Sequence, residues 1–297
     1  MPKIRDDPTF GKHRTFQKLC RLTVTNNVMN WFSIHLYPLD NQDVFLVRSL
    51  RPFLQQHIWA TRGARAFFIR YQDEQGPHIR LRMQGEPGWM QETLRPAFDA
   101  WQEGLGEWRE VPYSPEMERF GGESAIGLAE AHFHLSSRVV LEQLAQERHA
   151  YGDSMFDALR MHTISAHAAG MTQTKAAQYF GRLTEQWLPM FFASENGAAD
   201  PEVLAEIRAG FEKTFASQQD VLRASLRALW KALDKEKFDK KQPEWARWSS
   251  GNQLIFKELG ENLERALPSL IHLTNNRLGL NNQDEVYLNF ILSKVLA

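Results

Sequence analysis

The chain has 297 residues, of which 43% are hydrophobic, including nine Trp and nineteen Phe, which is enough for a sizeable buried core. Its 35 Lys and Arg nearly balance its 36 Asp and Glu, and the net charge of -1 argues against direct binding of nucleic acid or an anionic membrane. The single cysteine, Cys20, excludes an intrachain disulfide and a cysteine-based zinc site. Because the N-terminus has no signal-peptide core and no stretch approaches about 18 apolar residues, we expect a soluble cytoplasmic protein.

The N-terminal half contains three stretches typical of strands. Residues 1–27 are basic and rich in turn formers, so we expect a partly ordered arm there. Alternation of apolar and polar residues then predicts a strand at 30–37. Further along, the sequence RAFFIRYQDEQGPHIRLRMQ predicts two strands, at 65–71 and 78–84, joined by a turn.

Two helices are predicted between and after these strands. The first begins near Asp43, a plausible N-cap, and contains Pro52, which should kink it. The second spans 91–103 and has Pro96 near its middle. The order strand, helix, strand, strand, helix predicts an α+β fold, with an antiparallel sheet and flanking helices in residues 28–123.

From Ser124 onward helical periodicity dominates, and we predict no strand between 124 and 297. We treat 28–297 as one domain, whose helical part is 124–297. Asp153, Thr172 and Asp200 are plausible helix starts. The predicted helices cover 124–134, 136–149, 153–169, 173–192, 201–234, 245–266 and 283–296.

The strand at 78–84 presents an unusual polar face. Ile79, Leu81 and Met83 point to one side, so His78, Arg80, Arg82 and Gln84 must point to the other. One interpretation is a solvated sheet face with ordinary surface arginines. The other is a preformed site for a carboxylate or phosphate, since Arg offers a rigid fork of donors.

Two further motifs carry charged residues in apolar or glycine-rich surroundings. YSPEMERFGG places Glu116 and Arg119 three residues apart, which is also the spacing of a local salt bridge. IHLTNNRLG places His272 among apolar residues, followed by Asn276 and Arg277. A single histidine in such a context is often a hydrogen-bonded structural residue, so neither motif defines a site by itself.

The histidines do not form a recognisable metal motif. His132 and His134 are two residues apart, and on a helix such a pair points to different sides. His162 and His167 are also badly spaced, and no HExxH-type sequence occurs. We therefore predict no metal site.

The three motifs FFIRYQDEQGPHIRLR, YSPEMERFGG and HLTNNRLG stand in one order. Together they resemble the C-terminal glutamate-elimination domain of class I lanthipeptide dehydratases, which also occurs alone in thiopeptide-type bacteriocin biosynthesis. The likeness covers residues 29–297 and lacks the large glutamylation domain of the full-length enzymes. The family's arginine pair corresponds to Arg80 and Arg82, and its other three charged residues correspond to Glu116, Arg119 and His272. Phe120 departs from the family, which often has Tyr there.

The resemblance implies a lyase that expels glutamate from glutamylated Ser or Thr of a precursor peptide, leaving dehydroalanine or dehydrobutyrine. We expect Arg80, Arg82, Glu116, Arg119 and His272 to be catalytic and to meet in one cleft. We expect four other side chains to contact the substrate: His78, Arg70, Asn276 and Arg277. The expected partners are the glutamylated precursor, a separate glutamyl-tRNA-dependent glutamylation protein and, as an assembly to consider, a second copy of the chain.

The chemistry of β-elimination agrees with these residue types. The reaction needs a base for a Cα proton, stabilisation of an enolate and support for a departing carboxylate. Arginines suit both anions and a histidine suits proton transfer, so no metal or organic cofactor is required. Glu116 either transfers a proton or orients Arg119. Two alternatives stay open: a pyridine-forming cyclase of the same fold, and a non-catalytic subunit that binds the precursor peptide.

Overall fold

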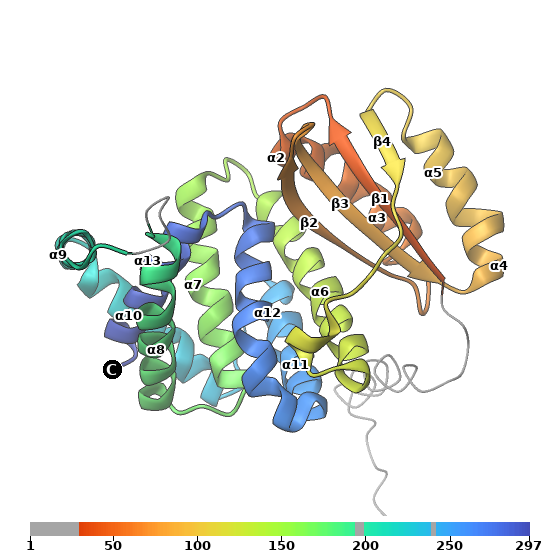
Figure 1. Cartoon of the computed structure of the whole chain (residues 1–297). Helices are drawn as coiled ribbons and strands as arrows, with labels where there is room; N and C mark the ends of the chain where they lie inside the picture. Colours follow the sequence, from red (N-terminus) through yellow and green to blue (C-terminus); the bar gives the residue numbers. More distant parts are fainter. Residues whose placement is uncertain (1–29, 194–198, 239–241) are drawn as a thin grey trace, which may run out of the picture. The chain divides into compact units, whose positions relative to one another are not determined.

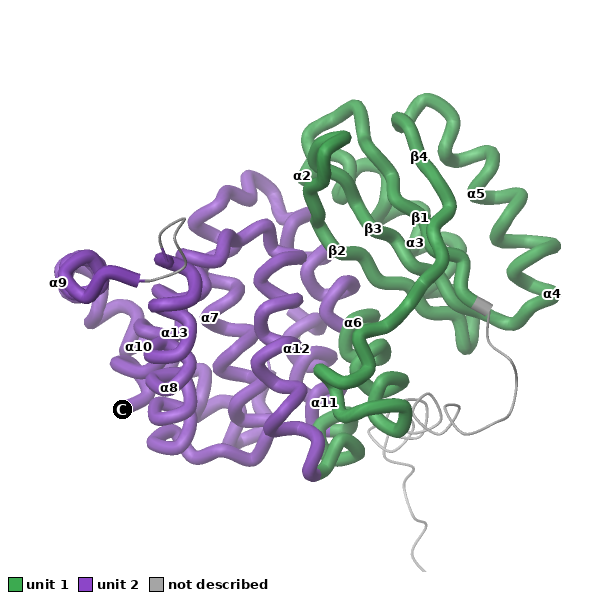
Figure 2. Tube along the Cα trace, viewed as in Figure 1, with its two compact units in different colours: residues 1–134, 254–260 green, residues 135–253, 261–297 purple. Residues whose placement is uncertain are grey.

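The computed structural model describes residues 30–193, 199–238 and 242–297, and it divides into two compact units (Figure 2). The first unit contains the described residues up to His134 and the segment Leu254–Gly260; the remaining described residues form the second. The chain passes from one unit to the other after residues 134, 253 and 260. The arm predicted for residues 1–27 lies outside the described residues. None of the helices described is both long and apolar enough to cross a membrane.

The first unit contains a four-stranded antiparallel sheet with the strand order β2-β3-β1-β4 (Figure 1). The three predicted strands are confirmed as β1 (Asn30–Pro38), β2 (Arg65–Asp73) and β3 (Gly76–Gly85). The edge strand β4 (Gly106–Glu110) was not predicted. It is short and starts with glycine, and only its pairing with β1 makes it a strand.

One face of the sheet is the core of this unit. In the register of β1 and β3, Leu36 pairs with Ile79 and Ile34 with Leu81, and these four side chains are at most 1% exposed. Helices cover this face (Figure 1), as the edge-to-face contact between Phe32 of β1 and Phe98 shows. The alternation read from the sequence therefore identifies the core face correctly.

In both helices on this face, a π-helical segment precedes the proline. A π-helical segment, Leu46–Leu50, lies between α2 (Gln42–Phe45) and α3 (Arg51–His57), and the same arrangement, Met90–Leu94, precedes α5. Pro52 and Pro96 each follow the widened turn, since proline has no N–H to continue the α-helical ladder. The flanking elements are α4 (Pro87–Trp89) and α5 (Arg95–Trp101).

The cap of the first helix differs from the sequence expectation. Asn41, not Asp43, is the N-cap, because its side-chain oxygen accepts a hydrogen bond from the Asp43 amide at 2.8 Å. Asp43 lies in the first turn instead, where a carboxylate suits the helix dipole.

The second unit consists of helices in the residues described, as predicted. The helices from the boundary onward are α6 (Glu123–Leu144), α7 (Tyr151–Ala168), α8 (Gln173–Phe191), α9 (Pro201–Ala216), α10 (Gln219–Asp234), α11 (Pro243–Leu259), α12 (Leu263–Leu278) and α13 (Asn282–Val295). The two helices predicted over 124–149 are one helix, α6, and the predicted 201–234 helix is two. The predicted caps Thr172 and Asp200 are confirmed, whereas Asp153 lies in the first turn of α7, whose N-cap is Ala150.

Helix α12 was not predicted, although it carries His272. It contains Pro268, and Asn275, Asn276 and the C-cap Gly279 lie at its end; Pro, Asn and Gly are residue types that also form turns. The helix forms because Leu267, Leu270 and Ile271 are buried at helical spacing. It ends at Gly279, whose left-handed φ of 82° closes the C-cap.

The edge strand β4 depends on Gly106. A Cβ there would lie 2.0 Å from the carbonyl oxygen of Tyr37, and the φ of Gly106 is 135°. We predict that Gly106→Ala lowers the free energy of unfolding by more than about 2 kcal/mol, because β4 must move away from β1. The matched control is Gly104→Ala, also at positive φ but with nothing within 4 Å, which should cost about 1 kcal/mol. Equal losses in urea denaturation would contradict this account.

Candidate functional site

The face of the sheet opposite the core gathers arginine and histidine side chains, and we call it the arginine face. In the antiparallel register His35 of β1 lies between Arg80 of β3 and Arg109 of β4, and Ser33 pairs with Arg82. The face is defined by Ser33, His35, Tyr37, Tyr71, His78, Arg80, Arg82 and Arg109. It brings together three of the residues singled out from the sequence: His78, Arg80 and Arg82.

The part of the arginine face around Arg82 and His78 is buried, which the interpretation as a solvated sheet face does not account for, whereas Tyr71 on the edge strand is exposed. Arg82 is only 8% exposed and His78 is fully buried. Aromatic rings flank the guanidinium groups: that of Arg80 lies 3.2 Å from the centroid of Tyr71, and that of Arg82 lies 5.2 Å from the centroid of Tyr113. These rings stabilise the cations but accept no conventional hydrogen bond.

Several buried polar atoms on the arginine face have no hydrogen-bond partner among the described residues. They are Ser33 Oγ, His35 Nδ1, His78 Nε2, Arg80 Nε, Arg82 Nε and Arg82 Nη1. A buried donor without a partner costs about 1–3 kcal/mol, and more when it is charged. Six such atoms on one sheet face are costly for folding, and guanidinium donors of this kind suit an anion with several acceptor oxygens.

The charge state of the face follows from burial. Burial, with Arg80 and His78 nearby, lowers the pKa of His35 to about 4, so this imidazole is neutral at pH 7. Burial also lowers the pKa of His78. The pKa of Arg82 falls to about 10 for the same reason, which leaves its guanidinium charged at neutral pH. The face therefore combines cationic arginines with neutral histidines.

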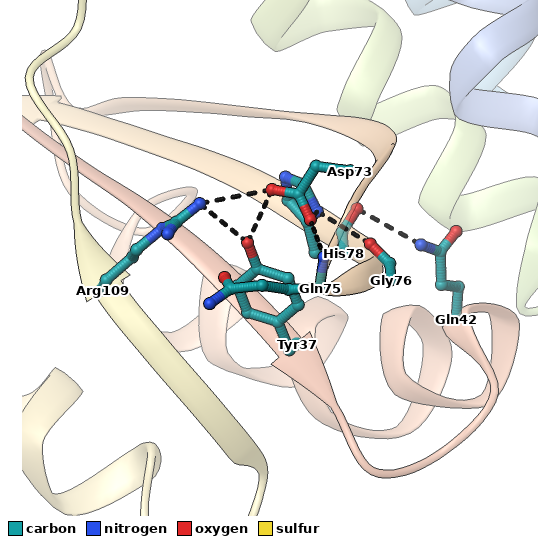
Figure 3. A network of polar contacts seen from close by, with 7 residues as sticks. All are labelled: Tyr37, Gln42, Asp73, Gln75, Gly76, His78 and Arg109. Atoms are coloured by element: carbon teal, nitrogen blue, oxygen red, sulfur yellow. Dashed lines mark hydrogen bonds and ion pairs between the residues drawn. The ribbon is translucent and has the colours of Figure 1, made fainter.

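A hydrogen-bond network around Asp73 holds one end of the face (Figure 3). One carboxylate oxygen accepts from Tyr37 at 2.9 Å and from Arg109 at 3.2 Å, and the other accepts from the Gln75 amide at 3.0 Å. The Nδ1 atom of His78 lies 3.2 Å from the Gly76 carbonyl, which fixes Nδ1 as the protonated nitrogen. The other ring nitrogen, Nε2, then carries the lone pair and is the buried atom without a partner.

Three of these residues also have the composition of a metal site. His35, Asp73 and His78 each offer one ligand atom within 4.8 Å of the others, the one such group among the residues described. Both oxygens of Asp73 are already engaged, and three arginines share the face with the two histidines. The arrangement favours an anion over a cation, because a divalent ion would add to an already positive site.

Two predicted residues of the first unit lie elsewhere. Arg70 points to the core side of the sheet, where its guanidinium contacts Asp43 at 2.5 Å, so it is not part of the arginine face. Glu116 and Arg119 form an exposed ion pair at 2.7 Å beside a short 3-10 helix, Met117–Phe120. No hydrogen bond or ion pair links this pair to the arginine face in the part of the chain that the structure describes.

The remaining predicted residues are in the second unit. The Nδ1 atom of His272 lies 3.0 and 3.1 Å from the two carboxylate oxygens of Glu285, and its side chain is 30% exposed. Asn276, four residues after His272, is half-buried. Arg277 is fully buried and donates to Ser137 and to the Leu273 carbonyl, so it contacts protein groups. The meeting of His272 with the arginines of the first unit stays a prediction.

Sequence reasoning missed several polar residues at these positions. His35 and Tyr37 alternate with the apolar residues of β1, so the sequence indicated on which side of the strand they lie. It did not indicate which residues of the paired strands lie beside them. Arg109 lies in the unpredicted strand β4. Glu130 of α6 is also buried, and burial raises the pKa of its carboxyl to about 7 despite a hydrogen bond from Tyr113. Nothing in the sequence distinguishes Glu130 or Glu285 from ordinary helix glutamates.

Comparisons with known proteins agree with this architecture. The sequence profile of the family described as lantibiotic biosynthesis dehydratase C-term matches residues 31–296. No curated protein matches the chain. Among solved structures, the pyridine synthase TbtD from thiomuracin biosynthesis has a TM-score of 0.68 at 14% identity, covering 90% of this chain and 97% of that one. TsrL has a TM-score of 0.62 at 13% identity, covering 90% and 94%.

A third structure is longer than this chain. The tRNA-dependent lantibiotic dehydratase MibB from Microbispora sp. 107891 has a TM-score of 0.49 at 23% identity, and the likeness covers 89% of this chain but 28% of that one. The likeness to TbtD and TsrL shows that this chain shares their fold. The profile spans nearly the whole chain, which therefore belongs to the lantibiotic biosynthesis dehydratase C-terminal family.

Because Arg82 has buried donors without a partner among the described residues, we predict that replacing it increases the stability of the protein although it impairs function. We expect Arg82→Met to raise the free energy of unfolding by about 1–3 kcal/mol, because it replaces an incompletely bonded buried cation with an apolar side chain. Arg95→Met is the matched control, since Arg95 also lies over an aromatic ring, Phe32, but is ion-paired with Glu110. It should lower stability by at most about 1 kcal/mol. A loss of stability in Arg82→Met would assign Arg82 a structural role instead.

Proposed function

We propose that the chain is a lyase that eliminates glutamate from glutamylated Ser or Thr of a ribosomally made precursor peptide. The observation that carries this proposal is the pair Arg80 and Arg82: the buried Nε atoms of both, and Nη1 of Arg82, have no partner among the described residues. A departing carboxylate and an enolate oxygen are the two anions of the reaction, and both accept hydrogen bonds from such donors.

The proposed step is a β-elimination. The Cα–H bond of the esterified residue breaks, its proton passes to a base, and its electron pair forms the Cα=Cβ double bond. The Cβ–O bond breaks and its electrons leave with the glutamate carboxylate. The arginine face binds the negative charge that develops, in surroundings with little water, where such interactions are strongest. The neutral state of His35 keeps the face from carrying still more positive charge.

The other family residues receive roles in the same proposal. His272 transfers the proton, since an imidazole nitrogen can both accept and donate a proton and the Nε2 atom of His272 has no hydrogen bond within the described ranges. Arg119 adds a third guanidinium for the anion. Glu116 orients Arg119, as their 2.7 Å ion pair supports. His78 and Asn276 are proposed to contact the peptide, whereas the positions of Arg70 and Arg277 support roles within the protein.

The proposal implies two partners. The precursor peptide must arrive with the glutamyl ester already formed, so a separate glutamyl-tRNA-dependent protein is proposed to form it. Because glutamyl-tRNA is used in the cytoplasm, we place the reaction there. We also propose that two copies of the chain associate as a homodimer.

Pyridine formation is the second candidate function. The fold likeness to the pyridine synthase TbtD supports it, although an identity of 14% carries the fold alone. A cyclase joins two dehydrated residues and has no glutamate carboxylate to bind. The charged residues Arg80, Arg82, Arg119 and His272 therefore favour elimination. A non-catalytic peptide-binding subunit has no evident need for them.

We predict that Arg119→Ala and His272→Ala each block release of glutamate while the glutamyl ester stays on the peptide. The expected losses in rate are on the order of 10²–10³ for an anion-binding donor and about 10²–10⁴ for a proton-transfer group. Arg80→Lys should also impair turnover, because an ammonium cannot replace a planar fork of donors. The assay is mass spectrometry of a preformed glutamylated peptide, which loses one glutamate per elimination.

Three outcomes separate the candidate functions. A wild-type chain that leaves the ester intact but closes a pyridine ring on a dehydrated peptide would establish the cyclase instead. Wild-type elimination with full activity in every charged-residue variant would disprove the residue assignment but keep the reaction. A chain that binds the peptide and converts neither substrate is a binding subunit.

A further inference from the structure

The second unit contains a buried carboxylate that the sequence did not point to. Glu285, in the first turn of α13, is only 1% exposed. Both of its oxygens lie within 3.1 Å of one atom, Nδ1 of His272 on α12. A buried carboxylate is expensive unless it is paired and hydrogen-bonded, so this position requires a partner such as His272.

The pairing determines the state of the imidazole. A carboxylate accepts hydrogen bonds, so the Nδ1 atom of His272 must carry a proton. In the neutral ring the lone pair is then on Nε2, which makes no hydrogen bond within the described ranges, and the side chain is 30% exposed. The hydrogen bond to Glu285 therefore occupies Nδ1 of His272, and Nε2 is the nitrogen that can accept a proton.

Further contacts hold the pair in place. The indole of Trp187 on α8 packs edge-to-face on the imidazole of His272, with ring centroids 6.5 Å apart. The backbone amide of Glu285 donates to the Asn281 carbonyl at 3.1 Å, which fixes the base of the carboxylate side chain in the first turn of α13.

We propose that Glu285 is a positioning residue for His272: it fixes the Nδ1–H tautomer and presents Nε2 as the nitrogen that transfers the proton. This assignment rests on the proposed elimination, in which His272 is the proton-transfer group. A carboxylate behind a histidine also stabilises the imidazolium that forms when Nε2 takes a proton. Glu285 itself does not contact the substrate.

The test uses Glu285→Gln in the full chain, a change that keeps the size and a hydrogen-bond acceptor but removes the charge. We expect kcat for elimination to fall on the order of 10²-fold with little change in KM, because proton transfer is affected rather than binding. The nitrogen chemical shifts of the His272 ring should show a larger share of the Nε2–H tautomer, because the carboxylate that fixes the proton on Nδ1 is gone. Glu285→Asp, which retains the charge, should recover part of the rate.

A double mutant separates positioning from a purely structural role. In a His272→Ala background, adding Glu285→Gln should cost no further activity, because the carboxylate acts only through the imidazole. The matched control is Asp234→Asn, which removes the carboxylate that lies 3.1 Å from His167 in the same unit. It should leave both elimination and the tautomer of His272 unchanged.

The proposal and the proposed function fail in different ways. If the wild type is active and Glu285→Gln leaves both kcat and the tautomer of His272 unchanged, the role of Glu285 alone is overturned. An equal loss from Glu285→Gln in the wild-type and His272→Ala backgrounds also overturns it and indicates a structural residue. A wild type without elimination activity overturns the proposed function and the catalytic part of this assignment, even if the nitrogen chemical shifts show His272 as the Nδ1–H tautomer.

Discussion

The burial of guanidinium groups on a sheet face is the constraint on which the first unit depends. Arg82 is 8% exposed and two of its nitrogens have no partner among the described residues. Desolvating such a cation costs several kcal/mol, and aromatic neighbours offset only part of that cost. The hydrophobic packing on the other face of the same strands must offset the rest. A strained arrangement of this kind is typical of binding sites, where stability is lower than it could be.

Asp73 limits the charge that gathers on this face. Its carboxylate is the anionic neighbour of Arg109 and accepts a hydrogen bond from Tyr37 (Figure 3). Burial acts to raise the pKa of Asp73, but the hydrogen bonds from Tyr37 and Gln75 outweigh it and lower that pKa. Asp73 therefore stays ionised at neutral pH and partly balances Arg109, whereas Arg80 and Arg82 have no carboxylate partner in the described residues.

The surroundings of the histidines differ between the two units. On the arginine face, burial and neighbouring cations lower the pKa of His35, so its imidazole is neutral. In the helical unit, a buried carboxylate receives the Nδ1 proton of His272. The first environment disfavours the imidazolium, and the second fixes which ring nitrogen carries the proton. The two imidazoles therefore differ in their chemistry because His35 has arginine neighbours and His272 has a carboxylate neighbour.

The sequence alone determined the α+β architecture, because alternation in β1, β2 and β3 and the change to helical periodicity near Ser124 are local properties. It also determined which face of β3 carries Arg80 and Arg82, and its motifs led to the correct family. It could not reveal strand β4, which exists only through pairing with β1, or helix α12, whose proline and asparagines resemble a turn. Tertiary structure alone decided that Arg82 is buried, that His35 lies between two arginines and that Glu285 meets His272. Each of these depends on contacts between residues distant in the chain, which no local pattern encodes.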